Sequence, residues 1–169
     1  MFSGFSDNDH GEGTLMNLTL LRHGIADAHG SEDLRALTGE GRLQIEELSR
    51  QLHKNGEVYD LILSSPLLRT RQTADIFADT FGLRDKLVCD ARLACGCHTS
   101  DLQSALQEHR QAHNVLAVGH MPDLGLISAE LLGLKEALEF QRGSALKLKG
   151  QNLRAGQATL LFFVHPGMF

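Results

Sequence analysis

The sequence is poor in cysteine and in aromatic side chains: its 169 residues include three Cys, one Tyr and no Trp. Three cysteines cannot form the dense disulfide framework of small secreted domains, so we expect a reducing, cytoplasmic compartment. No apolar run approaches the ~18 to 20 residues that a membrane-spanning helix needs, and the sequence has no repeats, low-complexity tracts or interdomain linker. These absences, together with the length, predict one globular domain with a core of Leu, Ile, Val, Ala and Phe.

The chain also lacks an excess of positive charge, since its formal net charge is −5. A basic surface is typical of proteins that bind nucleic acid or an anionic membrane, so we expect neither partner. A site for an anionic substrate must therefore be a local cluster of Arg and His. There is no glycine-rich phosphate loop ending in Lys and Ser or Thr, which argues against a kinase or a nucleotide hydrolase.

The first residues differ in composition from the rest of the chain. They are rich in Gly, Ser, Asp and Asn, and they lack the basic start and the apolar stretch of a secretory signal. We predict a flexible N-terminal extension over residues 1–15 and a single domain over residues 16–169.

Short apolar runs alternate with amphipathic segments through that domain. Buried strands are predicted at residues 17–21, 60–64 and 114–118, and further strands at 86–89, 144–149 and 158–164. Helices are predicted at residues 39–54 after a Thr38 cap, 66–81 after a Ser65 cap with Pro66 in first position, 100–109 and 123–132. Because the early strands are continuous apolar runs alternating with helices, we expect a three-layer α/β/α fold with a mostly parallel central sheet.

Unusual polar residues follow three of these strands. Arg22 and His23 come directly after the first strand, and His120 comes directly after the third. Ser65 and Arg69 follow the second strand. Because ligands bind outside the carboxyl ends of strands in open α/β sheets, residues almost a hundred positions apart should share one rim.

Two arginines and two histidines at one rim suit a phosphoryl group. Arg presents a planar fork of donors that matches phosphate oxygens, and a helix amino terminus adds free N–H groups. A neutral histidine can attack phosphorus and form a covalent phosphoenzyme that water then hydrolyses. Since the side chains supply the positive charge, we expect no metal and no other cofactor. The segment Cys95-x-Cys97-His98 lacks a second pair of ligands, so zinc is not expected there either.

Together these motifs resemble the histidine phosphatase superfamily, the group of phosphoglycerate mutases and related acid phosphatases. The matching segments follow the family's order: Leu21-Arg22-His23-Gly24, Leu37-Thr38 with Gly41, Ser64 to Arg69 with Gln72-Thr73-Ala74, and Val118 to Pro122. The resemblance implies a phosphoglycerate mutase-like fold and a nucleophile at His23 that becomes phosphorylated. It also implies that Arg22 and Arg69 grip the phosphate, and that His120 completes the pocket and stabilises the transition state.

Within that superfamily the chain most resembles the small SixA-type phosphohistidine phosphatases. The domain is short, and Arg35 stands where that group has a similar Arg close to the phosphate. The segment 92–98 also lacks the glutamate that mutases and many monoesterases use as general acid. A phosphoramidate has a better leaving group than an alkyl phosphate, so the missing acid would cost less. The resemblance therefore implies a protein carrying phosphohistidine as the substrate.

Two alternatives stay open at this point. Asp90, His98 or Asp101 could replace the missing general acid, and the protein would then be a phosphomonoesterase acting on a small phosphorylated metabolite. A catalytically weak phosphate-binding module would use the same arginines and histidines without turnover.

Overall fold

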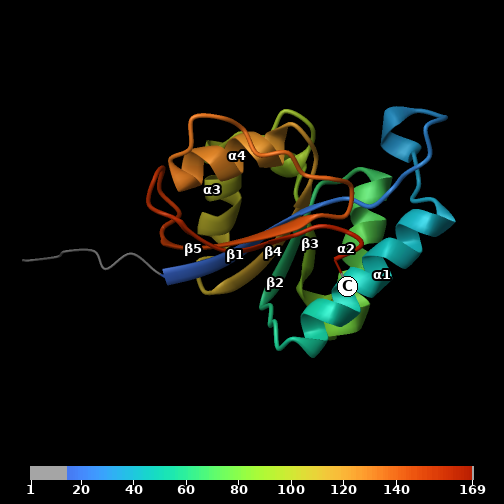
Figure 1. The fold of residues 1–169 in the computed structure, drawn as a ribbon, viewed down its shortest axis with the longest axis horizontal. Coiled ribbons are helices and arrows are strands. Elements are labelled where there is room, and N and C mark those ends of the chain that lie inside the picture. Colours follow the sequence, from blue (N-terminus) through green and yellow to red (C-terminus); the bar gives the residue numbers. More distant parts are fainter. Residues whose placement is uncertain (1–14, 169) are drawn as a thin grey trace, which may run out of the picture.

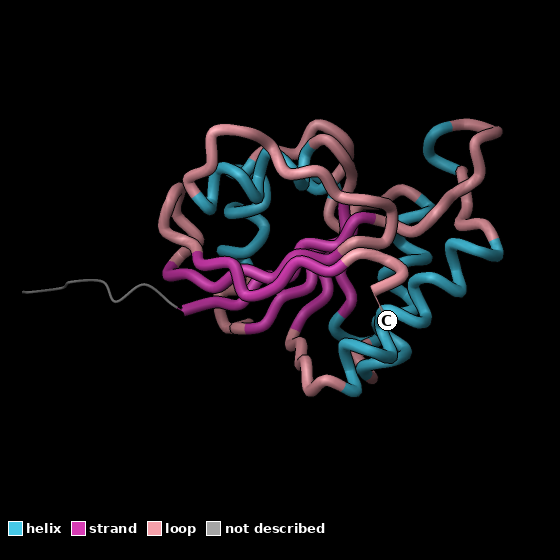
Figure 2. The backbone as a smooth tube through the Cα atoms, viewed as in Figure 1, coloured by secondary structure: helices cyan, strands magenta, loops and turns pink. Residues whose placement is uncertain are grey.

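The computed structural model describes residues 15–168 (Figures 1 and 2). The strands are β1 (Leu15–Arg22), β2 (Leu61–Ser64), β3 (Leu87–Cys89), β4 (Asn114–Gly119), β5 (Ala145–Gln151) and β6 (Thr159–Val164). The helices are α1 (Gly39–Lys54), α2 (Leu68–Phe81), α3 (Thr99–Glu108) and α4 (Asp123–Leu132), with short 3-10 turns η1 (Glu32–Leu34), η2 (Arg84–Lys86) and η3 (Ala91–Leu93). The flexible extension predicted for residues 1–15 lies outside the described residues, apart from Leu15 in β1.

The six strands form one mixed sheet in the order β3-β2-β4-β1-β5-β6. The strands β1 to β4 are parallel to one another, while β5 is antiparallel to both β1 and β6. One strand, β5, therefore runs against the other five, and the prediction of a mostly parallel sheet is confirmed.

Helices cover both faces of this sheet, as Figure 1 shows. On one face, Leu18 and Leu20 of β1 belong to a core with residues of α3 and α4, such as Leu102 and Ile127. On the other face, Leu21 of β1 belongs to a second core with residues of α1 and α2. Successive strand residues point to opposite faces, so a continuous apolar strand supplies both cores. The predicted three-layer α/β/α fold is confirmed. Within residues 15–168, none of the helices combines the length and the apolar character that crossing a bilayer requires.

Helix α1 begins where the sequence predicts it, because the Thr38 side chain accepts a hydrogen bond from the backbone N–H of Gly41 at 3.0 Å. The predicted start of α2 is wrong. Ser65 does not cap this helix and Pro66 is not its first residue, since α2 begins at Leu68. The Ser65 hydroxyl lies instead 2.7 Å from Nε2 of His120. The hydroxyl also accepts from the backbone N–H of Leu67, just before α2, at 3.4 Å, so Ser65 links the end of β2 to His120 and to the start of the helix.

The parallel strands bring their carboxyl ends to one edge of the sheet. Arg22 of β1 is in register with Gly119 of β4, and Ser64 of β2 is in register with Val118. Residues that follow these three strands therefore start from neighbouring positions along a single rim.

Candidate active site

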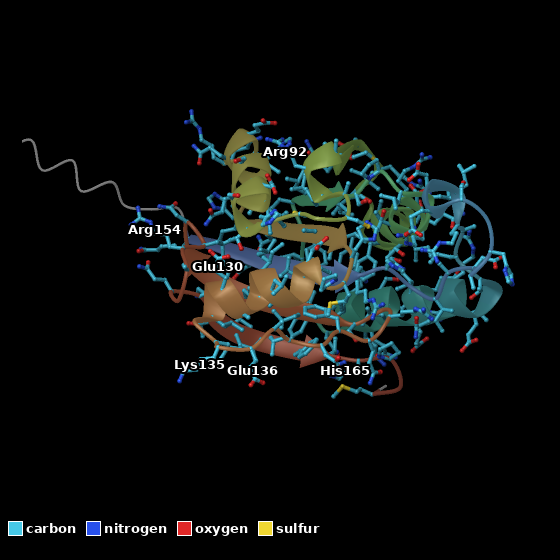
Figure 3. The ribbon with its side chains drawn as sticks, turned by 90° about the horizontal axis from the view of Figure 1, so that it is seen from above. Arg92, Glu130, Lys135, Glu136, Arg154 and His165 are labelled. Atoms are coloured by element: carbon cyan, nitrogen blue, oxygen red, sulfur yellow. The ribbon has the colours of Figure 1, made fainter. Side chains whose placement is uncertain are left out.

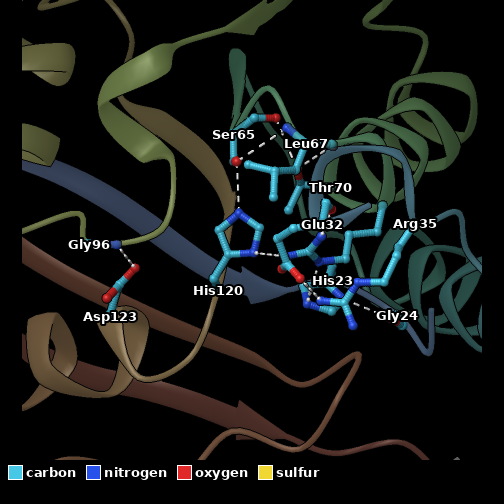
Figure 4. Close-up of polar contacts among 11 residues, drawn as sticks. His23, Gly24, Glu32, Arg35, Ser65, Leu67, Thr70, Gly96, His120 and Asp123 are labelled. Atoms are coloured by element: carbon cyan, nitrogen blue, oxygen red, sulfur yellow. Dashed lines mark hydrogen bonds and ion pairs between the residues drawn. The ribbon is translucent and has the colours of Figure 1, made fainter. Parts of the chain in front are cut away.

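A pocket of about 180 Å³ lies at this rim, and it is called the rim pocket below. Its wall includes Arg22, His23, Glu32, Arg35, Arg69 and His120, with Arg142 at its edge. The structure thus brings together the arginines and histidines that the sequence singled out. His23 and His120 are neighbours in this pocket (Figure 4), with ring centroids 5.5 Å apart and ring planes tilted by 58°.

The His23 ring is buried and is held at both nitrogens. Its Nδ1 lies 2.8 Å from the carbonyl oxygen of Gly24, which can only accept, so Nδ1 carries the proton. Its Nε2 accepts a hydrogen bond from Nε of Arg69 at 3.2 Å. Burial lowers the pKa of His23 to about 3, and the positive charges of Arg69 and Arg22 act in the same direction. His23 is therefore a neutral imidazole at cellular pH, with its Nε2 lone pair directed toward the guanidinium of Arg69.

Close packing of backbone behind His23 fixes this ring. The backbone N–H of Gly24 donates to the Thr73 hydroxyl in α2 at 3.2 Å. A Cβ at Gly24 would lie 2.9 Å from the carbonyl oxygen of Gly41 in α1, and one at Gly41 would lie 2.0 Å from the carbonyl oxygen of Ile25. The segment after β1 thus touches α1 directly, and only glycine permits that approach.

Arg69 is the central cation of the rim pocket and is 3% exposed. It lies in the first turn of α2, and its guanidinium reaches three neighbours. Besides the bond to His23, it donates to the main-chain carbonyl of Glu32 at 2.8 Å and to the Glu32 carboxylate at 2.5 Å. Its third neighbour is His120, whose Nδ1 lies 3.4 Å from the guanidinium.

His120 closes the wall between Arg69 and Ser65. Because a guanidinium can only donate, Nδ1 of His120 accepts from Arg69, and Nε2 carries the proton that it donates to Ser65. Burial, with the charge of Arg69 as the second cause, lowers the pKa of His120 to about 4. Both histidines of the pocket are therefore neutral while it is empty, and its positive charge comes from arginine.

Arg22 and Arg35 each bring a buried donor without a partner among the described residues, namely their Nε atoms. Arg22 donates to the carbonyl oxygen of Phe140 at 2.5 Å, and Arg35 is bound to the Glu32 carboxylate. Burial, reinforced by the charge of Arg142, lowers the pKa of Arg22. Both arginines line the rim pocket, so their positive charge acts on any anion bound there.

Sequence reasoning missed two residues of this pocket, Glu32 and Arg142. Glu32 stands three positions before Arg35, a spacing that lets the two side chains meet across the single turn of η1. Arg142 precedes β5, and the backbone N–H of the following Gly143 donates to the carbonyls of Arg22 and His23 at 3.2 and 3.0 Å. Because β5 is antiparallel to β1, its amino end lies at the rim. A prediction of the direction of β5 could therefore have placed Arg142 near the pocket.

Comparisons with known proteins agree with this arrangement. A model of the histidine phosphatase superfamily (branch 1) matches residues 18–94. The chain belongs to the histidine phosphatase superfamily. An uncharacterised protein of Picosynechococcus sp. is 34% identical over 155 residues, which cover 86% of this chain and 88% of that protein.

Solved structures share the fold of this histidine phosphatase. The protein histidine phosphatase SixA in complex with tungstate superposes with a TM-score of 0.81 and 23% identity, over 89% of this chain and 97% of that one. A phosphoserine phosphatase of Entamoeba histolytica superposes with a TM-score of 0.67 and 18% identity, over 88% and 96% of the two chains. Superfamily membership identifies the chain as a phosphatase.

The three residues considered as replacements for the general acid do not line the rim pocket of this histidine phosphatase. Asp90 is bound to Arg92, which lies at the periphery of the molecule in Figure 3. That contact lowers the pKa of Asp90, so its carboxyl group carries no proton to donate at cellular pH. Asp101 accepts from the backbone N–H of His98 at 2.9 Å, and the His98 side chain is 82% exposed. The carboxylate that does line the pocket is that of Glu32.

Within residues 15–168, no group of three or more His, Cys, Asp or Glu side chains is arranged to hold a metal ion. Cys95 lines the edge of the rim pocket, and Cys89, Cys95 and Cys97 are all free thiols. Burial raises the pKa of Cys95, so this thiol carries little thiolate near neutral pH.

Proposed function

We propose that the protein is a metal-independent phosphatase that works through a phosphohistidine intermediate on His23, and that its substrate is a protein carrying phosphohistidine. The observation that carries the mechanism is the state of the His23 ring. Its Nδ1 proton is held by the Gly24 carbonyl, so the ring's lone pair is on Nε2 at the rim pocket. This lone pair accepts from Nε of Arg69 while the pocket is empty, and that hydrogen bond breaks when Nε2 attacks phosphorus.

The first half-reaction forms a bond between Nε2 of His23 and the phosphorus atom. The bond from phosphorus to the substrate's nitrogen or oxygen breaks, and its electron pair leaves with that atom. A phosphohistidine ring that has taken a proton from solvent at its other nitrogen leaves as neutral imidazole. Arg22, Arg35 and Arg69 bind the phosphoryl oxygens and neutralise their charge. The dianion raises the pKa of His120 from its low value, and the protonated ring then donates a further hydrogen bond to the transition state.

Water completes the reaction by attacking the phosphorus atom of phospho-His23. The P–Nε2 bond breaks, its electron pair returns to Nε2, and phosphate leaves with both protons of the water, as dihydrogen phosphate. The proton on Nδ1 of His23 stays there through both half-reactions, because it is held by its hydrogen bond to the Gly24 carbonyl. His23 thus returns to its starting tautomer.

The protonation state of the pocket supports a phosphoramidate as the substrate. The pKa of Glu32 is lowered, first by its hydrogen bond to Arg35, so the carboxylate that lines the pocket is ionised and offers no proton to a leaving alkoxide. The imidazole of phosphohistidine leaves without strong acid catalysis. The similarity to the SixA fold supports the same assignment, and the three free cysteines are compatible with a cytoplasmic location.

A small-molecule phosphomonoesterase is the second candidate, favoured by the structural similarity to a phosphoserine phosphatase. In that case Glu32 would have to gain a proton when substrate binds and then act as the acid. A catalytically weak phosphate-binding module is the third candidate; the presence of Arg22, His23, Arg69 and His120 in one pocket argues against it.

Turnover of three substrate types separates these candidates: a phosphohistidine-carrying domain, para-nitrophenyl phosphate and an alkyl phosphate. We expect kcat/KM to be highest for the phosphohistidine domain and at least about 100-fold lower for the alkyl phosphate, which corresponds to about 2.7 kcal/mol of missing acid catalysis. Equal rates on the alkyl phosphate would favour the monoesterase. Binding of phosphate without any turnover would favour the weak module.

A further inference from the structure

The carboxylate of Glu32 lies between two arginines of the rim pocket. One of its oxygens accepts from the Arg69 guanidinium at 2.5 Å, and the other accepts from the Arg35 guanidinium (Figure 4). Two oxygens of one anionic group thus take up donors that would otherwise bind two oxygens of a phosphoryl group. The pocket holds an anion of its own.

Arg69 does not need this carboxylate to keep its place. Its guanidinium also donates to the main-chain carbonyl of Glu32 at 2.8 Å and to Nε2 of His23 at 3.2 Å. Both contacts persist if the Glu32 side chain moves or is replaced. The carboxylate contact is therefore an addition to a guanidinium that is already anchored.

The two partners differ sharply in their freedom to move. The Arg69 side chain is 3% exposed, whereas that of Glu32 is 56% exposed and projects from η1, a turn without buried residues. A ligand that competes for Arg69 can therefore displace the Glu32 side chain into solvent at little packing cost, while Arg69 stays in place.

We propose that the Glu32 carboxylate is an internal competitor for the phosphoryl group and sets the affinity of the rim pocket for phosphorylated ligands. This inference rests on the proposed function, since it assumes that Arg35 and Arg69 bind the phosphoryl oxygens. Substrate must break both carboxylate contacts before it binds, and the returning carboxylate helps to displace product phosphate. Glu32 therefore raises the KM for substrate and weakens inhibition by inorganic phosphate in equal proportion.

The test compares Glu32→Gln with Asp33→Asn. Asp33 lies in the same turn, is exposed, and forms no ion pair among the described residues, so both variants lose one negative charge but only the first changes the pocket. Binding of inorganic phosphate is measured by calorimetry at pH 7, and KM and kcat are measured with para-nitrophenyl phosphate. Glu32→Ala, which keeps the main-chain carbonyl, serves as a second variant, and melting curves verify that each variant folds.

We expect Glu32→Gln and Glu32→Ala to lower both the phosphate Kd and the KM by about tenfold, with kcat within about twofold of the original value. Asp33→Asn should change each quantity by less than about twofold. An unchanged phosphate Kd in both Glu32 variants would overturn the proposal. So would a large loss of kcat with unchanged KM, which would make Glu32 a proton donor.

Because phosphate binding is measured separately from turnover, failure of this inference can be distinguished from failure of the proposed function. The unaltered protein could bind phosphate more weakly than Glu32→Gln and yet turn over no phosphorylated substrate. That result would support competition by the Glu32 carboxylate and contradict the proposed catalytic function. If the protein turns over substrate and the Glu32 variants bind phosphate as it does, the competitor fails alone. Absence of phosphate binding in all variants contradicts the competitor proposal, and absence of turnover as well contradicts both.

Discussion

The proton on Nδ1 of His23 decides what this residue can do. A carbonyl oxygen at 2.8 Å cannot donate, so the Gly24 backbone selects the tautomer whose Nε2 is a nucleophile. The same ring could not attack if Nε2 held the proton. A single main-chain oxygen, placed by the close contact of residues 24 and 41, therefore prepares the reacting atom.

Arg142 is the arginine of the pocket whose role is easiest to isolate. It forms no ion pair among the described residues, and its charge acts on Arg22 across the pocket edge. We expect Arg142→Ala to raise the KM for para-nitrophenyl phosphate by about tenfold with a smaller effect on kcat, because one cation that attracts the dianion is lost. Steady-state kinetics give both values.

Arg154→Ala is the matched control, since this exposed arginine follows the carboxyl end of β5, whereas Arg142 precedes the amino end at the rim. It removes the same charge far from the pocket. Equal increases of KM in the two variants would mean that Arg142 acts only through the overall charge of the protein.

At the scale of elements, the contact between α1 and the segment after β1 determines the position of the chain beside His23. We expect Gly41→Ala to lower the free energy of unfolding by about 3 kcal/mol and to reduce kcat, because its Cβ would lie 2.0 Å from the Ile25 carbonyl and push on the chain beside His23. Urea unfolding and activity assays measure the two effects.

Gly39→Ala, two residues earlier in the same helix, has open space around the added Cβ. It should leave activity unchanged and stabilise the protein by up to about 1 kcal/mol, because alanine favours a helix over glycine. Similar losses in both variants would contradict this account, because the close approach is present only at residue 41.

The sequence allowed most elements to be predicted, for reasons that are local. Continuous apolar runs identify the parallel strands, and Thr38 marks the start of α1 because its hydroxyl caps the helix. The start of α2 was misplaced because Ser65 and Pro66 match a helix start locally, while a residue 55 positions away, His120, takes the hydroxyl. Glu32 and Arg142 were missed because their places depend on the turn of η1 and on the direction of β5, and neither is encoded within a short window.

At the scale of the whole molecule, the buried neutral histidines link stability to pH. The pKa of His23 is about 3 and that of His120 about 4 in the folded protein, below the value of ~6.5 for an unfolded chain. Below pH 6.5 the unfolded state therefore binds more protons than the folded state. The stability is undiminished above pH 6.5 and falls as the pH is lowered toward 4, by up to about 1.4 kcal/mol per pH unit for each histidine.

Urea unfolding at pH 7 and pH 5 tests this linkage. We expect the two histidines to lower the free energy of unfolding by about 4 kcal/mol between the two values, and by about half as much in a His120→Asn variant, which keeps one of the two histidines. The carboxylates of the chain titrate alike in both proteins, so the difference isolates His120. The same pH dependence in both proteins would mean that the buried histidine does not contribute.

The fold supplies each part of the site from a different strand end, and the parallel sheet brings those ends to one edge. In the proposed reaction, phosphorus becomes bonded to Nε2 of His23. The most direct measurement is a rapid alkali quench after mixing the enzyme with a ³²P-labelled phosphohistidine domain, followed by separation of the two proteins and acid treatment of the labelled enzyme. The protein should carry up to one label per chain, labile in acid and stable in alkali, and His23→Ala should carry none. Label that persists in His23→Ala, or rapid turnover by the original protein without any trapped label, would contradict the account.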